Sequence, residues 1–197
     1  LVIMAILVNA VQQHKNKVEA EKRIELAKQK SVIDDTENAL MLVQTVSVSP
    51  QVVSILQRRI LNALSTISQL TPGAADIRQR IKSTEEALKQ INVDKPAPTE
   101  EAFKLPTEDK HVIQLIKGIK NLRTLLRSEH RKGKVENNIF ITEDKVLERM
   151  QLRANVETLI RRGEVALKNQ QLGSARQCLE KAIGALSTQS NPDEYVT

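Results

Sequence analysis

Residues 49–70 read SPQVVSILQRRILNALSTISQL, and this stretch decides the fold class. Ser49 has a hydroxyl that can cap a helix, and Pro50 follows at the first helical position, where no amide hydrogen bond is lost. Large apolar residues then recur every three or four positions, the period of a helix with one face in a core. They are Val52, Val53, Leu56, Ile60, Leu61, Leu64, Ile67 and Leu70. The stretch therefore predicts a core-facing helix.

The amino-acid composition points the same way. Of the 197 residues, 40% are hydrophobic but only 2% are aromatic, so a core must be built from Leu, Ile, Val and Ala. Long segments are rich in Glu, Lys, Gln, Arg, Leu and Ala, which favour helices, whereas strands favour aromatic and β-branched residues. We predict an all-α fold of helical hairpins, packed as a bundle or a short solenoid and preceded by a long N-terminal helix.

Turn-forming residues divide the chain into regions. A first helical region spans residues 32–91 and is interrupted at Thr71-Pro72-Gly73. Residues 92–108 hold three of the six prolines and are predicted to be a linker. A second helical region spans residues 109–197.

Helix starts inside the second region are predicted from capping residues. We expect Thr107 to cap a helix that ends near residue 132, and Thr142 to cap a helix that ends near residue 169. Gly173-Ser174 is expected to open the last helix, which ends near residue 186.

The first 17 residues read LVIMAILVNAVQQHKNK. Residues 1–8 are apolar on every side of a helix but are too few to span a bilayer, which takes about 20 residues. Basic residues follow closely, so we interpret residues 1–10 as the cytoplasmic end of a single membrane anchor. Residues 11–31 are then a polar helical stalk. This places the protein on the cytoplasmic face of a bacterial inner membrane.

Two other interpretations of the first residues stay open. They can be a buried core segment or oligomer contact, in which case the protein is a soluble cytoplasmic one. They can also be a secretion signal, because Val8-Asn9-Ala10 is similar to a signal-peptidase site. The basic residues just beyond this site oppose translocation, so the anchor is favoured and the signal is ranked last.

Residues 159–186 read LIRRGEVALKNQQLGSARQCLEKAIGAL. Over residues 156–189 the chain resembles one tetratricopeptide-repeat hairpin, in which small residues let two antiparallel helices approach closely. Arg162 and Ser187 depart from the usual leucine and proline. Ile160 and Glu164 stand where carboxylate-clamp repeats have Lys and Asn, so the resemblance does not extend to recognition of a carboxylate tail. The resemblance implies packing positions at Leu159, Gly163, Ala166, Leu172, Ala175, Leu179 and Ala182. The overall layout is similar to that of bacterial single-anchor helical proteins.

The sequence offers no motif for catalysis. It has no phosphate-binding glycine loop, paired-cysteine metal motif or HExxH pattern. His14, His111 and His130 lie far apart, and the one cysteine, Cys178, is expected to pack as a small apolar residue. A metal site at His111 with Glu108 is less favoured than a surface histidine. We expect no enzyme activity, no catalytic residue, no metal and no cofactor.

Residues 110–134 carry a local basic excess, with eight Lys or Arg against the single acid Glu129. At 100° per residue, several of these cations form a stripe beside the apolar face of the helix. Such a stripe can bind the phosphates of nucleic acid or acidic lipid. The alternative, a solvated face partly neutralised by acids of neighbouring helices, is favoured. The candidate anion-binding residues are Lys117, Lys120, Arg127, Arg131, Lys132 and Lys134.

Together these features predict a non-enzymatic, membrane-tethered cytoplasmic helical module that binds another protein. One alternative is an anion-binding protein that uses the basic stripe, with nucleic acid as a less favoured ligand. A second alternative is a structural protein that self-associates through a helix over residues 1–46.

Overall fold

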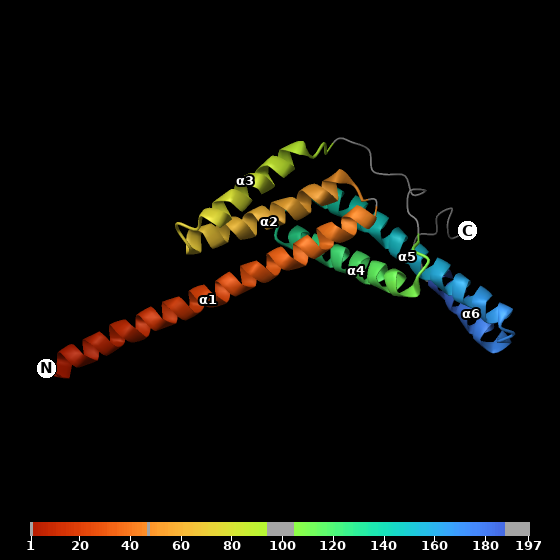
Figure 1. Ribbon diagram of the computed structural model, residues 1–197, viewed down its shortest axis with the longest axis horizontal. Helices are drawn as coiled ribbons and strands as arrows, with labels where there is room; N and C mark the ends of the chain where they lie inside the picture. Colours follow the sequence, from red (N-terminus) through yellow and green to blue (C-terminus); the bar gives the residue numbers. More distant parts are fainter. Residues whose placement is uncertain (1, 47, 94–104, 188–197) are drawn as a thin grey trace. The chain divides into compact units, whose positions relative to one another are not determined.

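The computed structural model describes residues 2–46, 48–93 and 105–187, and this part of the chain forms six helices and no strand (Figure 1). The all-α prediction is confirmed. The helices are α1 (Val2–Thr45), α2 (Pro50–Leu70), α3 (Ala75–Gln90), α4 (Asp109–Arg131), α5 (Asn137–Lys168) and α6 (Leu172–Ser187).

The chain divides into two compact units. Unit 1 consists of residues 1–40 and 53–95, and unit 2 consists of residues 41–52 and 96–197. Each unit has a set of buried aliphatic residues, as the scarcity of aromatic residues requires.

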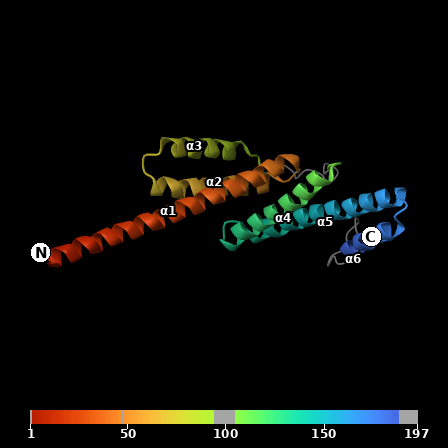
Figure 2. The same cartoon turned by 60° about the horizontal axis from the view of Figure 1, so that its bottom comes forward.

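Unit 1 packs the second half of α1 against α2 and α3. The stripe of α2 predicted from the sequence supplies most of this core, and α2 and α3 run antiparallel after a turn at Gly73, whose φ is 106° (Figure 2). The buried cluster is Ile33, Ile60, Ala63, Leu64 and Ile67. Leu26, Val32, Leu40, Ile77 and Ile81 pack around it.

Polar contacts also join the helices of unit 1. The Arg59 guanidinium donates from Nε to Thr36 Oγ1 at 3.0 Å, and both side chains are buried. Arg80 of α3 donates to Glu37 of α1 at 2.7 Å, and both side chains are partly exposed. Burial of an arginine is acceptable here because Thr36 satisfies part of its hydrogen-bonding capacity.

Residues 11–24 of α1 form a solvated stretch of helix. Side chains of residues 11–24 are all exposed, and partial burial begins only at Glu25 and Leu26. Within the described residues, no helix contains an apolar run long enough for a membrane crossing. The side chains of residues 1–8 and 10, on which the predicted anchor depends, lie outside the described ones, as do residues 94–104 of the predicted linker.

Unit 2 is built on α4 and α5, which run antiparallel and lie side by side in both views (Figures 1 and 2). The apolar stripe of α4 is buried as predicted, and a matching set on α5 is buried with it. These residues are Val112, Leu115, Ile119, Leu122, Leu125, Leu126, Leu147, Met150 and Ala154.

One helical glycine holds a close contact in unit 2. A Cβ placed on Gly118 in α4 would lie only 2.5 Å from Leu42 Cδ2 at the end of α1. Such a distance is well inside van der Waals contact, so Leu42 occupies the space that the absent side chain leaves. This role could not be predicted, because the neighbour of an isolated glycine within a helical pattern is unknown until the fold is known.

The turns that follow α4 and α5 share one hydrogen-bond pattern. After α4, Gly133 N donates to His130 O at 2.9 Å and Lys134 N donates to Glu129 O at 3.1 Å. This pair of bonds defines a Schellman motif, which needs a left-handed residue after the helix. Gly133 supplies it with a φ of 69°.

The turn after α5 makes the same bonds without a glycine. Gln170 N donates to Leu167 O at 2.9 Å, and Gln171 N donates to Ala166 O at 2.8 Å. The left-handed position is Gln170, with a φ of 60°. A side chain in this conformation costs about 1–2 kcal/mol, so the α5–α6 turn is strained where the α4–α5 turn is not.

Two of the three predicted caps are wrong. The residue before α4 is Glu108 rather than Thr107, and it makes no capping bond with its side chain. Thr142 lies inside α5, where its hydroxyl donates to Asn138 O at 2.9 Å. The Thr142 error has a definite cause: a hydroxyl can bond a carbonyl within a helix as well as cap one. Ser49 does cap α2, accepting a bond from Val52 N at 3.3 Å.

Candidate interaction surfaces

The α5–α6 hairpin packs through small residues. Gly163 and Ala166 of α5 and Ala175 and Ala182 of α6 are all buried. A Cβ placed on Gly163 would lie 3.5 Å from Leu179 Cδ2 and 3.6 Å from Cys178 Cβ, which is ordinary contact. Larger residues complete the hairpin interface: Leu152 and Val156 of α5 are buried with Ala182, and Leu159, Ala185 and Leu186 pack against them.

Not every residue expected to pack in the hairpin does so. Leu159 packs against its cluster and Leu179 contacts Gly163 although it is 39% exposed, whereas Leu172 is 70% exposed. Leu172 is the first residue of α6 and directly follows the turn after α5. The Arg162 position, where the repeat resemblance expects leucine, has its own partner in Asp109 at 2.9 Å.

The hairpin leaves a set of aliphatic side chains in solvent on one face. At 100° per residue, Ile160 and Leu167 lie within about 60° of Gly163 on α5, and Leu172 and Ile183 lie within about 40° of Leu179 on α6. Because Gly163 and Leu179 are in contact and the helices are antiparallel, both sets turn toward the same side. We call Ile160, Leu167, Leu172, Leu179 and Ile183 the hairpin face.

The aliphatic side chains of the hairpin face are more exposed than those of a helix face buried in a core. Leu172 and Ile183 are 70% and 66% exposed, and Leu167 is 48% exposed. Single exposed aliphatic residues are normal, whereas several on one side of a hairpin form an apolar patch, a feature that interaction sites commonly have. Val165, 52% exposed, lies on the opposite side of α5 and is not part of this face.

The side of α4 that faces α5 carries an ionic network. Arg123 donates from Nε to Asp144 Oδ1 at 2.8 Å and from Nη2 to Asp144 Oδ2 at 3.1 Å, a two-pronged contact. Arg123 also reaches Glu148 at 3.1 Å and Gln151 at 3.3 Å. The side chains of Arg123 and Asp144 are only 16% and 18% exposed, so water screens this pair weakly.

Neighbouring charges decide the ionisation of Asp144. Burial by itself would raise the pKa of this carboxyl, but hydrogen bonds and charge from Arg123, and charge from Arg127, together lower it. The Arg123 pKa is raised, chiefly by its hydrogen bond to Asp144. The network therefore stays charged and joins α4 to α5.

The six candidate anion-binding residues fall into two groups in the structure. Arg127 lies 3.3 Å from Asp144, and Lys132 lies 2.8 Å from Glu129, so these two are neutralised in part. The other four are exposed and form no ion pair with any described residue: Lys117, Lys120, Arg131 and Lys134. Neutralisation by neighbouring helices thus reaches only one edge of the stripe.

The pKa of the buried Glu143 carboxyl is shifted in the opposite direction to that of Asp144. Glu143, one residue earlier on α5, is 7% exposed, and burial raises its pKa while a hydrogen bond from Ser49 opposes the shift. Ser49, itself buried, also caps α2, so one hydroxyl connects the α1–α2 turn to α5. Neither acid drew attention in the sequence, where each looked like part of a solvated helix face.

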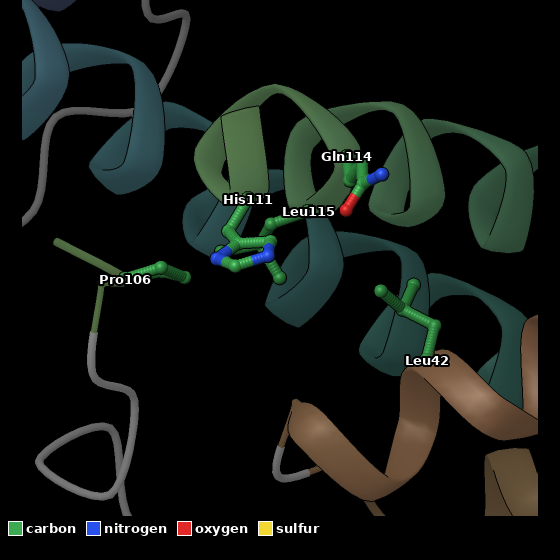
Figure 3. Close-up of a pocket in the computed structure, with 5 residues that line it drawn as sticks. All are labelled: Leu42, Pro106, His111, Gln114 and Leu115. Carbon is green, nitrogen blue, oxygen red and sulfur yellow. The ribbon is translucent and has the colours of Figure 1, made fainter. Parts of the chain in front are cut away.

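Unit 2 also contains a shallow pocket of about 290 Å³ (Figure 3). Figure 3 shows His111, Gln114 and Leu115 of α4 beside Leu42 of α1, with Pro106 from the segment before α4. His111 Nδ1 lies 3.4 Å from Glu108, and no nucleophile lies among these lining residues. The lining thus combines the polar side chains of His111 and Gln114 with the apolar ones of Leu42, Pro106 and Leu115.

Metal ligands do not gather in the described ranges. Within residues 2–46, 48–93 and 105–187, no three His, Cys, Asp or Glu side chains are placed to hold an ion. Cys178 is partly buried at the α5–α6 interface.

Comparison with known proteins gives no relative for this chain. No protein-family model matches it, and no curated protein or solved structure is significantly similar to it. The tetratricopeptide resemblance of residues 156–189 therefore stays a prediction, and function must be argued from the surfaces themselves.

Proposed function

We propose that this protein is a non-enzymatic helical module that binds another protein through the hairpin face. The observation that carries the proposal is the exposure of adjoining aliphatic side chains on α5 and α6, led by Leu172 at 70% and Ile183 at 66%. Burying one such side chain contributes about 1.5–3 kcal/mol, so covering this face supplies a real driving force for association.

The surroundings of the hairpin face suit a protein partner. An ion pair between Arg176 and Glu180, at 2.7 Å, borders the face on α6, and Glu164 borders it on α5. An apolar centre with a polar border is the usual layout of a protein interface. The aliphatic positions run along two antiparallel helices, and this arrangement accommodates the apolar stripe of one amphipathic helix.

Photo-crosslinking in cells that express the native gene tests the proposal. A photoreactive amino acid replaces Ile183 in one variant and Val165 in the control, which is similarly exposed but lies on the other side of α5. We expect a discrete adduct with a second protein from position 183 and none from position 165. The double substitution Leu172→Ser and Ile183→Ser should remove binding of that protein, while circular dichroism stays unchanged.

Two results would contradict the proposal. An absence of adducts at position 183 would mean that the face is idle. Adducts that join only two copies of this chain would mean that the face is a self-association surface.

Membrane attachment is a separate part of the proposal, supported by the apolar residues 1–8 and the basic residues that follow them. The full-length gene product should sediment with membranes and resist extraction by alkaline carbonate. Recovery in the soluble fraction would contradict attachment and leave the hairpin proposal intact.

A further inference from the structure

We propose that the outer face of α4 is a second binding surface, which holds the phosphate backbone of duplex nucleic acid without regard to its base sequence. We call this surface the cationic face and define it by Lys117, Lys120, Arg127 and Arg131. It is distinct from the hairpin face and needs none of its residues.

The pattern of ion pairs carries this inference. On the side of α4 toward α5, acids of α5 neutralise Arg123 and, in part, Arg127. On the outer side, Lys117, Lys120 and Arg131 are exposed and have no acidic partner in the part of the chain that the structure describes. Glu129, the one acid of α4 within this stretch, points away from them and is 3% exposed.

The geometry of the face matches a line of phosphates. From residue 117 to residue 131 a helix rises about 21 Å, and the four cations occupy an arc of about 80°. A duplex carries about one negative charge per 1.7 Å of its axis, so several phosphates lie within reach of such a rod. The helix is rigid because its opposite face is buried, with Ile119, Leu122 and Leu126 all at most 1% exposed.

Short polar residues between the cations strengthen the match. Asn121 and Ser128 fall within about 40° of Lys117 on the same helix, whereas the Thr124 hydroxyl already donates to Lys120 O at 3.0 Å. Amide and hydroxyl side chains of this kind hydrogen-bond to phosphate oxygens, alongside Lys and Arg.

The same residues argue against two other anionic partners. Single-stranded nucleic acid is held by aromatic side chains on which bases stack, and the cationic face has none. A helix that lies on a lipid surface inserts an apolar face beside its cations, whereas α4 has only Ile113 exposed there, before the first cation of the face. The phosphates of a duplex are the ligand that this surface fits.

Fluorescence anisotropy with a labelled 20-base-pair duplex of arbitrary sequence and the purified chain tests the inference. Three or four neutralised phosphates predict that the affinity falls by about 40- to 150-fold between 50 and 200 mM NaCl. The triple variant Lys117→Glu, Lys120→Glu and Arg131→Glu should bind at least about 100-fold more weakly than the unmodified chain.

The matched control reverses three exposed lysines of other helices, as Lys82→Glu, Lys89→Glu and Lys168→Glu. Both triple variants lower the formal net charge from +6 to zero, so a net-charge effect would weaken both equally. Selective loss in the α4 variant supports the cationic face. Equal loss in both variants, or no binding by the unmodified chain at 50 mM salt, would overturn it.

A second arm separates duplex from lipid. Sedimentation with vesicles of equal parts phosphatidylserine and phosphatidylcholine should show no binding that depends on Lys117, Lys120 and Arg131. Vesicle binding that requires these three residues, combined with weak duplex binding, would overturn the proposal in favour of a lipid surface. Circular dichroism of each variant verifies that the helices remain folded.

Discussion

The α5 helix forms two contacts that are built in different ways. Toward α4 it offers large buried aliphatics, a two-pronged arginine–aspartate pair and a turn with glycine in its left-handed position. Toward α6 it offers Gly163 and Ala166 beside Leu152, Val156 and Leu159. The hairpin leaves five aliphatic side chains partly or largely in solvent and turns through a strained Gln170. The α4–α5 contact thus joins large apolar residues and an ion pair, whereas the α5–α6 hairpin joins small and large residues and keeps apolar surface exposed.

This difference suggests that, in unit 2, the α4–α5 contact provides stability and the α5–α6 hairpin provides a binding surface. Helices that satisfy their own apolar and polar groups have little left to offer a partner. Helices that meet through small residues gain less from packing and keep aliphatic surface for another molecule. We therefore expect substitutions at the α4–α5 contact to change stability strongly, and substitutions in the hairpin to change it weakly.

The largest expected effect is at the Arg123–Asp144 pair. Asp144→Asn leaves a mostly buried guanidinium without its main partner and should lower the free energy of unfolding by about 2–3 kcal/mol at neutral pH. Urea unfolding measures it. The control Glu148→Gln removes an acid that is 52% exposed and should cost less than about 1 kcal/mol.

The pH dependence of this pair has a definite sign. The native pKa of Asp144 is lowered, so its contribution is complete above the unfolded pKa and is lost as the pH falls through the native pKa. The difference between the unmodified chain and Asp144→Asn should shrink in acid. If the stability difference between the two proteins does not change with pH, the pair stabilises the chain through packing rather than through charge.

Exchanging the residues at the two Schellman turns is expected to have the next largest effect. Gly133→Gln places a side chain at a φ of 69° and should destabilise the chain by about 1–2 kcal/mol. Gln170→Gly relieves the same strain after α5 and should stabilise it, by less because glycine also gains freedom in the unfolded chain. Thermal unfolding of both variants and of the double variant provides the test, and equal signs for the two single variants would contradict the comparison.

The buried Glu143 should give an effect of about 1 kcal/mol in the opposite direction to Asp144. Burial raises its native pKa, so the ionised carboxyl costs stability above that pKa, and the cost disappears as the pH falls toward the unfolded pKa. Glu143→Gln keeps a partner for Ser49 without the charge and should stabilise the chain at neutral pH but not in acid. Denaturation at both pH values tests this, and a destabilised variant at neutral pH would mean that the charge is needed.

The smallest effect is expected at Gly163, the position that the repeat resemblance treats as essential. Its Cβ would meet neighbours only at 3.5 Å or more, so Gly163→Ala should fit and stabilise α5 by about 0.5–1 kcal/mol. Gly118→Ala is the matched contrast, because its Cβ would lie 2.5 Å from Leu42 Cδ2 and should destabilise. If Gly163→Ala destabilises the chain and Gly118→Ala does not, the close contact lies at Gly163 rather than at Gly118, and the prediction is wrong.

The periodicity of apolar residues predicted the helices well because it reports burial directly. The α2 helix spans Pro50–Leu70, as the Ser49 cap and the Thr71-Pro72-Gly73 break indicated. The cap predicted at Thr107 was wrong, since Glu108 is the residue before α4. The cap predicted at Thr142 was wrong because its hydroxyl bonds Asn138 O within α5 instead.

The surfaces were harder to predict because each depends on pairs distant in sequence. The basic stripe was visible, but which of its cations have partners depends on where Asp144 lies. Glu143 and Asp144 are adjacent and look alike in the sequence, yet one faces a serine and the other two arginines. The Gly118–Leu42 contact, 76 residues apart in the numbering, had no local signal at all.

The exposed start of α1 has a mechanical consequence. Because residues 11–24 continue without interruption into the helix that packs in unit 1, they form a stiff rod of about 21 Å. A group attached at the N-terminal end of this rod is therefore held at a fixed distance from unit 1 and at a fixed angle around the helix axis. One inserted residue would rotate the attachment by about 100°, whereas seven would return it to within about 20° while adding two turns of length. The rod thus fixes direction, which a flexible linker of equal reach does not.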